Sequence, residues 1–395
     1  MKSLFPYRKL FGLSELAMVK KVFQNSWKRK LDFGYQEKFE NILTKKFVKF
    51  QGKGYCDGVN SGTNAMWLAL KALNIKDKKK EVLVSPITNP GSLSALSLEN
   101  FKIKIVDSEP DSFSISTKKF EDLVSKKTRL AVITHYAGLP IDLSKIKKIC
   151  KKKKIYLIED CSQGPGAEIN GRKVGNFGDI AVFSTGYRKN LATGGNGGLF
   201  YTRNRKFYNL ARSYADRGKP FFDKKFNQKD FHKYKYPGLN MNLDEISSAI
   251  GISILKKLPS IIKKRYLITK KIKKYLNRNS KIFSIENLPN NTYPSIYFII
   301  VKINLKFSKF NRKKIKHILK LKGLEFNPKH REVVCEWKWI KPYLIGKKLT
   351  PNAKKYRDES FNLYINEKFS NKNVNKILEI LMLVEKKCLN KIYKR

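Results

Sequence analysis

Short apolar runs recur along the first 200 residues of the chain, and segments with helical periodicity separate several of them. The runs are 82–85, 103–106, 130–134, 155–159, 180–184 and 198–202. Residues 63–73 and 143–154 instead repeat apolar side chains at the spacing of a helix. Runs of this length are typical of strands buried on both faces. Their alternation with helices predicts an α/β fold with a mostly parallel sheet flanked by helices.

The two ends of the chain have a different pattern. Residues 14–50 place apolar side chains at helical spacing and predict helices that lead into the fold. After about residue 255, lysine-rich helical segments flank one apolar run, 295–303. At 395 residues the chain is long enough for two domains. We therefore expect a large domain over 1–255, including the N-terminal helices, and a smaller C-terminal α/β domain over 256–395.

Composition narrows the class of protein. Apolar residues make up 41% of the chain, which fits a globular protein. The N-terminal residues do not read as a signal peptide, and no run is long enough to cross a membrane. The five cysteines are scattered without a C-x-x-C pair, so neither a metal site nor a disulfide framework is expected. These features predict a cytoplasmic protein without membrane insertion.

The formal net charge is +52, from 84 basic and 32 acidic residues. One interpretation is a basic, non-enzymatic protein that binds nucleic acid. The lysines are spread along the whole chain, however, which favours a general lysine bias and solvated surfaces. No helix-turn-helix or zinc pattern is present, so we expect no specific nucleic-acid recognition. A positive field would still attract a substrate that carries a diphosphate.

Residues with candidate catalytic or binding roles lie at the ends of two predicted strands. Asp160 follows the run 155–159, Ser184 ends the run 180–184, and Lys189 follows in a glycine-punctuated loop. Strand ends are where α/β sheets build ligand sites. An amine, an acid and a hydroxyl suit a phosphorylated pyridine cofactor with an aldehyde. The amine condenses with the aldehyde, the acid pairs with the ring nitrogen, and the hydroxyl binds the phosphate.

The order of residues in this stretch resembles a known family. The shared pattern consists of Glu159-Asp160-Cys161-Ser162-Gln163, Gly166-Ala167, Gly178-Asp179, Phe183-Ser184, Lys189-Asn190-Leu191 and Gly197-Gly198. It resembles the DegT/DnrJ/EryC1/StrS sugar aminotransferases, which are pyridoxal 5'-phosphate enzymes of the aspartate-aminotransferase fold (fold type I). The resemblance implies that Lys189 binds the cofactor covalently and moves protons, and that Asp160 pairs with the pyridine nitrogen. It also implies that Gln163 packs beside the cofactor and that Ser184 binds its phosphate.

A second motif, Ser61-Gly62-Thr63-Asn64, precedes an apolar helical segment. By itself it is an ordinary helix start, because serine and threonine are common N-caps. Its place in the chain matches the family's S-G-T motif. The resemblance therefore implies that Thr63 and Asn64 help to bind the cofactor phosphate at a helix N-terminus.

A third motif lies at 238–245, where relatives reach into the active site of a neighbouring subunit. Asn240 matches an asparagine that binds the partner's cofactor phosphate, which implies a homodimer. Asn242 stands where an arginine is usual, Asn89 replaces a common aromatic residue, and Asn196 replaces an acid. These departures leave open a homologue that has kept the fold and lost activity.

Two histidines match family positions less specifically. His135 precedes a glycine and an aspartate, as in relatives, but a strand histidine is more often structural. His330 loosely matches a C-terminal segment near the sugar.

The resemblance implies amino transfer, with glutamate as donor, to a nucleotide-linked keto sugar for surface polysaccharide or related glycan biosynthesis. The main alternative is a sugar dehydratase of the same family. Relatives that dehydrate carry histidine at the lysine position, so Lys189 favours amino transfer. The sugar, the nucleotide and the carbon that is aminated stay open.

Overall fold

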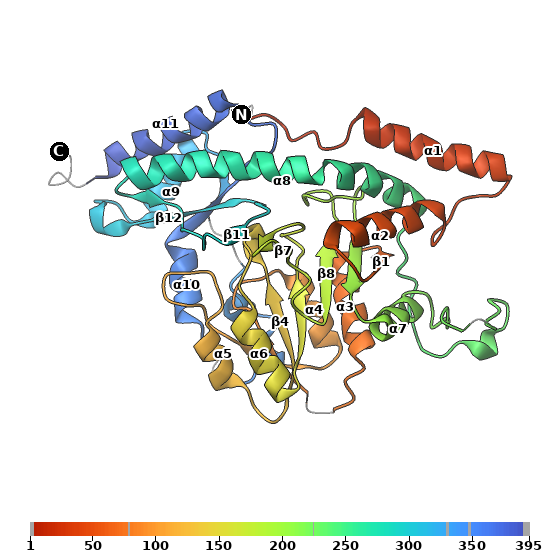
Figure 1. Ribbon diagram of the computed structural model, residues 1–395. Helices are drawn as coiled ribbons and strands as arrows, with labels where there is room; N and C mark the ends of the chain where they lie inside the picture. The colour runs from red at the N-terminus through yellow and green to blue at the C-terminus, as the bar shows by residue number, and fades with distance from the viewer. Residues whose placement is uncertain (1–3, 78–79, 224, 329–331, 347–348, 390–395) are drawn as a thin grey trace.

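A seven-stranded sheet forms the centre of the larger part of the molecule (Figure 1). The computed structural model describes residues 4–77, 80–223, 225–328, 332–346 and 349–389, so His330 lies outside the described residues. The strands are β1 (Tyr55–Val59), β2 (Glu81–Val84), β3 (Lys102–Ile105), β4 (Thr128–Thr134), β5 (Tyr156–Asp160), β8 (Ile180–Ser184) and β9 (Gly198–Thr202). Their order is β1-β9-β8-β5-β4-β2-β3, and β9 runs antiparallel to both of its neighbours. The other four pairings are parallel, which confirms the predicted mostly parallel sheet.

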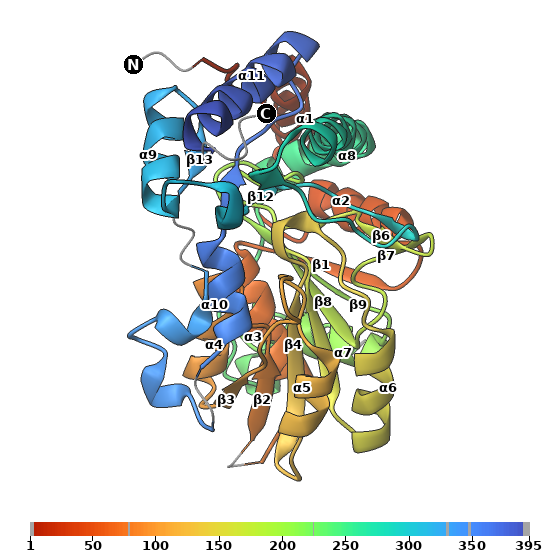
Figure 2. The same cartoon turned by 90° about the vertical axis from the view of Figure 1, so that its left-hand side faces the viewer.

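Helices cover both faces of this sheet (Figure 2). The helices of this part are α2 (Lys38–Gln51), α3 (Gly62–Leu73), α4 (Pro90–Leu98), α5 (Thr117–Leu123), α6 (Ser144–Lys153) and α7 (Arg205–Ala215). Along β4, Leu130 and Val132 join the core beneath α3 and α4, whereas Ala131 and Ile133 join the core beneath α5 and α6. Because successive side chains of a strand face opposite ways, a strand buried on both faces must be apolar throughout.

The smaller part contains a four-stranded antiparallel sheet with the order β10-β12-β14-β13. Its elements are β10 (Phe283–Ser284), β12 (Ile299–Ile303), β13 (Phe326–Asn327), β14 (Ser360–Leu363), α9 (Arg312–Leu321), α10 (Pro351–Asp358) and α11 (Asn371–Cys388). A third, three-stranded sheet joins the two parts. It consists of β6 (Glu168–Ile169), β7 (Arg172–Lys173) and β11 (Thr292–Tyr293).

One long helix, α8 (Glu245–Asn279), spans both parts and carries α1 (Leu13–Arg29) beside its first half (Figure 1). Leu255 and Leu258 pack with α2 under the large sheet, whereas Ile272 and Leu276 belong to the core of the smaller part. The expected division after residue 255 stays a prediction, and it falls inside this continuous helix. None of the described helices combines the length and the apolar character that a membrane span requires.

An ion-pair cluster fastens the N-terminal segment to the smaller part. Glu367 accepts hydrogen bonds from Arg8 Nε at 3.1 Å and from Arg265 Nε, on α8, at 2.9 Å. Burial lowers the pKa of Arg265 to about 10, although Glu367 opposes that shift. For Glu367, burial favours the neutral acid, but the two arginines outweigh it and lower the carboxyl pKa. The cluster therefore holds three distant segments through one buried carboxylate.

Glu367→Gln should destabilise the protein by about 3–5 kcal/mol at pH 7, because it leaves the buried guanidinium of Arg265 without a counter-charge. A carboxyl whose pKa is lowered on folding stabilises the fold above its unfolded pKa of about 4.3, and this contribution is lost as pH falls through the folded value. Urea unfolding of both proteins between pH 7 and pH 3 should show the difference shrinking with acidity. Glu379→Gln, at an exposed acid of α11, is the matched control. Equal stability of Glu367→Gln and wild type at pH 7 would contradict this role.

Candidate active site

A cavity of about 330 Å³ lies at the carboxyl ends of the parallel strands β2, β4, β5 and β8. It is lined by Ser61, Gly62, Thr63, Met66, Asn89, Gly91, Ser92, Thr134, Asp160, Ser162, Gln163, Val182, Ser184, Lys189 and Asn196. Five of the predicted site residues, Thr63, Asp160, Gln163, Ser184 and Lys189, therefore share one cavity. The position agrees with the rule that α/β sheets place ligands at strand ends.

Two predicted residues are not among the lining residues. The Asn64 side chain donates to Asn60 Oδ1 at 2.6 Å, and its backbone N–H donates to Ser61 Oγ. Asn240 is exposed, and its Oδ1 accepts from Asn242 Nδ2 at 2.8 Å. The cofactor roles of Asn64 and Asn240 stay predictions.

Asp160 is the last residue of β5 and is held in a fixed orientation. Its Oδ1 accepts from the backbone N–H of Ser162 at 3.0 Å, and its Oδ2 accepts a short hydrogen bond from Ser92 Oγ. Thr88 Oγ1 donates to Ser92 Oγ at 3.3 Å and lies 2.7 Å from Thr134 Oγ1. The carboxylate is thus buried but supported by donors, as a charged group away from water requires. Sequence reasoning missed Ser92, since a serine in a helix has no distinguishing local pattern.

Lys189 lies in the loop after β8, and contacts from distant segments hold this loop. Arg8 Nη1 donates to the carbonyl oxygens of Arg188 and Lys189 at 2.9 and 3.1 Å. Asn190 Nδ2 donates to the carbonyl oxygens of Ser295 and Ile296. The loop's place is therefore set by residues far away in the chain.

The amine of Lys189 faces an unusual environment for a lysine. Its Nζ lies 4.9 Å from the centre of the Tyr297 ring. Removal of the amine from water lowers the pKa of Lys189, and the charge of Asp160 only partly opposes this. A lowered pKa increases the fraction of neutral amine at a given pH, and the neutral amine is the nucleophile and the base.

The part of the cavity beside the start of α3 suits an anion. Helix α3 begins at Gly62 with Ser61 as its N-cap, and the first N–H groups of a helix lack intrahelical acceptors. A Cβ on Gly62 would lie 2.7 Å from Ser184 Cβ, so only glycine lets this helix start approach Ser184. The hydroxyls of Thr63 and Ser184 line the same part. Helix N–H groups and hydroxyls together form a common kind of phosphate site.

A buried hydrogen-bond network supports the cavity from behind. His135 Nδ1 accepts from the Ile141 N–H, so its Nε2 carries the proton that it shares with Glu159 Oε2 at 3.1 Å. Burial favours the neutral form of Glu159, but the bond to His135 and those from backbone N–H groups lower its pKa. Although the ligand atoms of these two residues and Cys161 lie within 4.8 Å of one another, hydrogen bonds already use those of the first two. These hydrogen bonds give His135 a structural role.

Gln163 also has a fixed side chain: its Oε1 accepts from the Ala137 N–H at 2.6 Å. Two departures from the family pattern, Asn89 and Asn196, line the cavity directly. Asn89 caps helix α4 by accepting from the Gly91 N–H at 3.2 Å. These two amides offer hydrogen bonds where relatives have an aromatic ring and an acid.

Comparisons with known proteins agree with this arrangement. The GDP-perosamine synthase of Escherichia coli O157:H7 is 29% identical over 243 residues, which are 62% of this chain and 63% of that protein. The GDP-4-keto-6-deoxy-D-mannose 3-dehydratase of Yersinia pseudotuberculosis is 30% identical over 236 residues, 56% of this chain and 60% of that protein. The chain thus spans less than two thirds of the length of these two relatives.

The fold also matches solved structures over nearly its full length. The X-ray structure of the aminotransferase from Psychrobacter cryohalolentis superposes with a TM-score of 0.88 at 22% identity, covering 96% of this chain and 98% of the other. This likeness identifies the fold. The sequence signature of the DegT/DnrJ/EryC1/StrS aminotransferases, in turn, matches residues 12–382. Since that match covers most of the chain, the protein belongs to the DegT/DnrJ/EryC1/StrS aminotransferase family.

Proposed function

We propose that the protein is a pyridoxal 5'-phosphate-dependent aminotransferase that moves an amino group from glutamate to a nucleotide-linked keto sugar. The product would serve surface polysaccharide or related glycan biosynthesis. The observation that carries the proposal is a desolvated lysine amine in the same cavity as a fixed, buried carboxylate. We place this activity in the cytoplasm, where nucleotide-linked sugars are made and used.

The residues of the cavity fit this cofactor. Thr63, Ser184 and the N-terminus of α3 would hold its phosphate, and Asp160 would pair with its ring nitrogen. Lys189 would hold its aldehyde carbon, with Gln163 packed beside the ring. When bound, the cofactor supplies the electron sink for a carbanion next to nitrogen.

The protein's own groups provide the proton chemistry. Lys189 Nζ, whose pKa desolvation lowers, would take a proton from the α-carbon of the amino donor. It would then return a proton to the sugar carbon that receives the nitrogen. The carboxylate of Asp160, held by Ser92 and Ser162, would stabilise a positive charge on the bound ring.

The dehydratase alternative rests on a real similarity, because a dehydratase and an amino-sugar synthase match the chain at almost equal identity. Overall likeness therefore does not separate the two reactions. The residue at position 189 favours one of the two reactions, because a lysine can reprotonate the intermediate before a neighbouring hydroxyl leaves. Lys189 thus favours amino transfer over dehydration.

We further propose a homodimer that completes both sites. Helix α1 leaves a row of large apolar side chains in solvent at helical spacing, namely Leu13, Leu16, Phe23 and Trp27. Leu13 is 85% exposed and Trp27 67%, which is a costly surface for a monomer. Asn240 lies outside the cavity of its own chain, as expected for a residue that serves the partner. A two-fold arrangement would supply both sites equally.

Lys189 should be the single point of covalent cofactor attachment. Borohydride reduction of the protein loaded with pyridoxal phosphate, followed by peptide mapping, should place the pyridoxyl label on Lys189. Lys189→Gln should lose the label, whereas Lys102→Gln, at an exposed lysine of β3, should keep it. A label on a different lysine would refute the assignment.

Asp160→Asn should lower the rate of amino transfer from glutamate by about a hundredfold or more, because a neutral amide no longer stabilises the ring charge. Ser92→Ala removes only one hydrogen bond to that carboxylate and should cost about tenfold. The rate is followed by the change in cofactor absorbance, with circular dichroism confirming the fold. A rate near that of wild type for Asp160→Asn would exclude it as the ring partner.

Mixed dimers should reveal whether Asn240 acts across the interface. Lys189→Gln and Asn240→Asp should each be nearly inactive, the second because a carboxylate would repel the partner's phosphate. A mixed dimer with one subunit of each variant can be isolated by two different affinity tags. One of its two sites then has an unchanged Lys189 from one subunit and an unchanged Asn240 from the other, so the dimer should recover about half of the wild-type activity. A mixed dimer as inactive as its parents would show that Asn240 does not serve the partner's site.

A further inference from the structure

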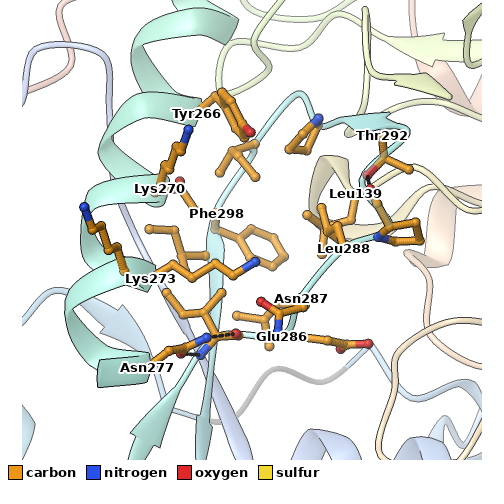
Figure 3. Close-up of a pocket in the computed structure, with 18 of the residues that line it drawn as sticks. Leu139, Tyr266, Lys270, Lys273, Asn277, Glu286, Asn287, Leu288, Thr292 and Phe298 are labelled. Carbon is orange, nitrogen blue, oxygen red and sulfur yellow. Dashed lines mark hydrogen bonds between the residues drawn. The ribbon is translucent and has the colours of Figure 1, made fainter. Parts of the chain in front are cut away.

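A second cavity, of about 550 Å³, lies between the C-terminal half of α8 and the segment 285–300 (Figure 3). None of its lining residues belongs to the catalytic cavity. Asn277 holds the segment to α8 by bonds to both the N–H and the carbonyl oxygen of Ile285 at 3.1 Å. At the other end, Thr292 and Tyr293 pair with β6. The segment is therefore anchored at two points, and the cavity lies between it and the fixed helix α8.

Cations gather on the α8 side of this cavity. Lys270 precedes Lys273 and Lys274 by three and four residues, and Arg278 follows Lys274 by four, so the four cations lie on one broad side of the helix. Among the described residues, none of these four takes part in an ion pair. Like charges at this spacing destabilise a helix by about 0.2–0.5 kcal/mol per pair, a cost that a bound anion would remove.

The acidic residue that lines this cavity, Glu286, already has two hydrogen-bond donors. It accepts hydrogen bonds from Ser112 Oγ at 2.9 Å and from the Tyr356 hydroxyl at 3.0 Å. Burial lowers the pKa of Lys273, and Glu286 opposes that shift without cancelling it. The cavity therefore keeps an excess of positive charge.

The wall across from these cations is mostly apolar. Figure 3 shows Leu139 and Leu288 across the cavity from Lys270 and Lys273, with Phe298 between them. An apolar cavity of this size with a few polar groups on one side is typical of small-molecule sites. The two sides together are complementary to a ligand with an apolar body and an anionic end.

We propose that this cavity binds an organic phosphate, whose anionic end contacts the α8 cations and whose aliphatic or aromatic body packs against Leu288 and Phe298. Lysine amines are common point-charge partners of phosphate. The shared chemistry is a diphosphate on an apolar body, which a prenyl diphosphate and a nucleoside diphosphate both provide.

This site would lie back to back with the catalytic cavity. Ile296 and Phe298 line it, whereas the ring of Tyr297, between them, lies 4.9 Å from Lys189 Nζ. Ser295 faces the same way and accepts from Asn190 Nδ2 at 3.2 Å. The segment 295–298 thus separates the two cavities, so the second is not a subsite for the substrate of the first.

Isothermal titration calorimetry of the cofactor-loaded protein, at about 0.15 M salt to screen diffuse attraction, tests the proposal. The probes are farnesyl diphosphate, adenosine diphosphate, inorganic pyrophosphate and farnesol. At least one organic diphosphate should bind about tenfold or more tightly than pyrophosphate and farnesol. Farnesyl diphosphate as the tighter ligand would identify an aliphatic body, and adenosine diphosphate an aromatic one.

Two variants and one control locate the binding. Lys273→Gln/Lys274→Gln should weaken the tighter probe about tenfold or more, and Leu288→Trp should do the same by filling the apolar part. Lys263→Gln/Lys264→Gln removes equal charge from an exposed part of α8 and should leave affinity within about twofold. Equal losses in the two lysine pairs, or full affinity in Leu288→Trp, would overturn the proposal. So would organic diphosphates that bind no more tightly than pyrophosphate. Pyridoxyl labelling at Lys189 in each variant shows separately that the catalytic cavity is intact.

Discussion

Desolvation of one amine is the constraint on which the site depends. The partly buried Lys189 amine lies beside Tyr297 and within reach of the Asp160 charge, and desolvation lowers its pKa. If the loop moved outward, water would solvate the amine and its pKa would return toward that of an ordinary lysine. The contacts that fix the loop, from Arg8 and to Ser295, therefore serve chemistry as well as stability.

The two parts of the molecule are coupled through the same contacts. The N-terminal segment carries Arg8, which joins the Lys189 loop to Glu367 and, through it, to Arg265 on α8. The smaller part thus contributes the Tyr297 ring beside Lys189 and, through Glu367 and Arg8, the electrostatic anchor of the Lys189 loop. A sheet alone would place Asp160 and Ser184 but would leave Lys189 on a loop without support.

Much of the fold could be predicted from the sequence, because buried parallel strands are apolar throughout and periodic helices separate them. The strand β1 was missed, since Asp57 and Gly58 hide its pattern. The length of α8 was also missed, because helical periodicity does not show where a core ends. The two-residue strands of the smaller part are set by pairing between distant segments and have no local signal.

The site residues, too, could be predicted where their signal is local in the sequence, and not where it depends on contacts between distant segments. Asp160, Ser184 and Lys189 could be identified because their spacing reflects strand ends and a family motif, and the structure groups them in one cavity. Ser92, Tyr297 and Arg8 could not, because each acts through a contact with a residue far away in the chain. The amides at 89 and 196 are visible in the sequence, but what they select depends on a substrate that it does not specify.

We propose that Lys189 directs this cavity to amino transfer. Mass spectrometry of the products formed from ¹⁵N-glutamate and a panel of nucleotide-linked keto sugars tests it most directly. An amino sugar that carries the ¹⁵N label is the expected product. A deoxy keto sugar without nitrogen would contradict this proposal and assign the protein to dehydration.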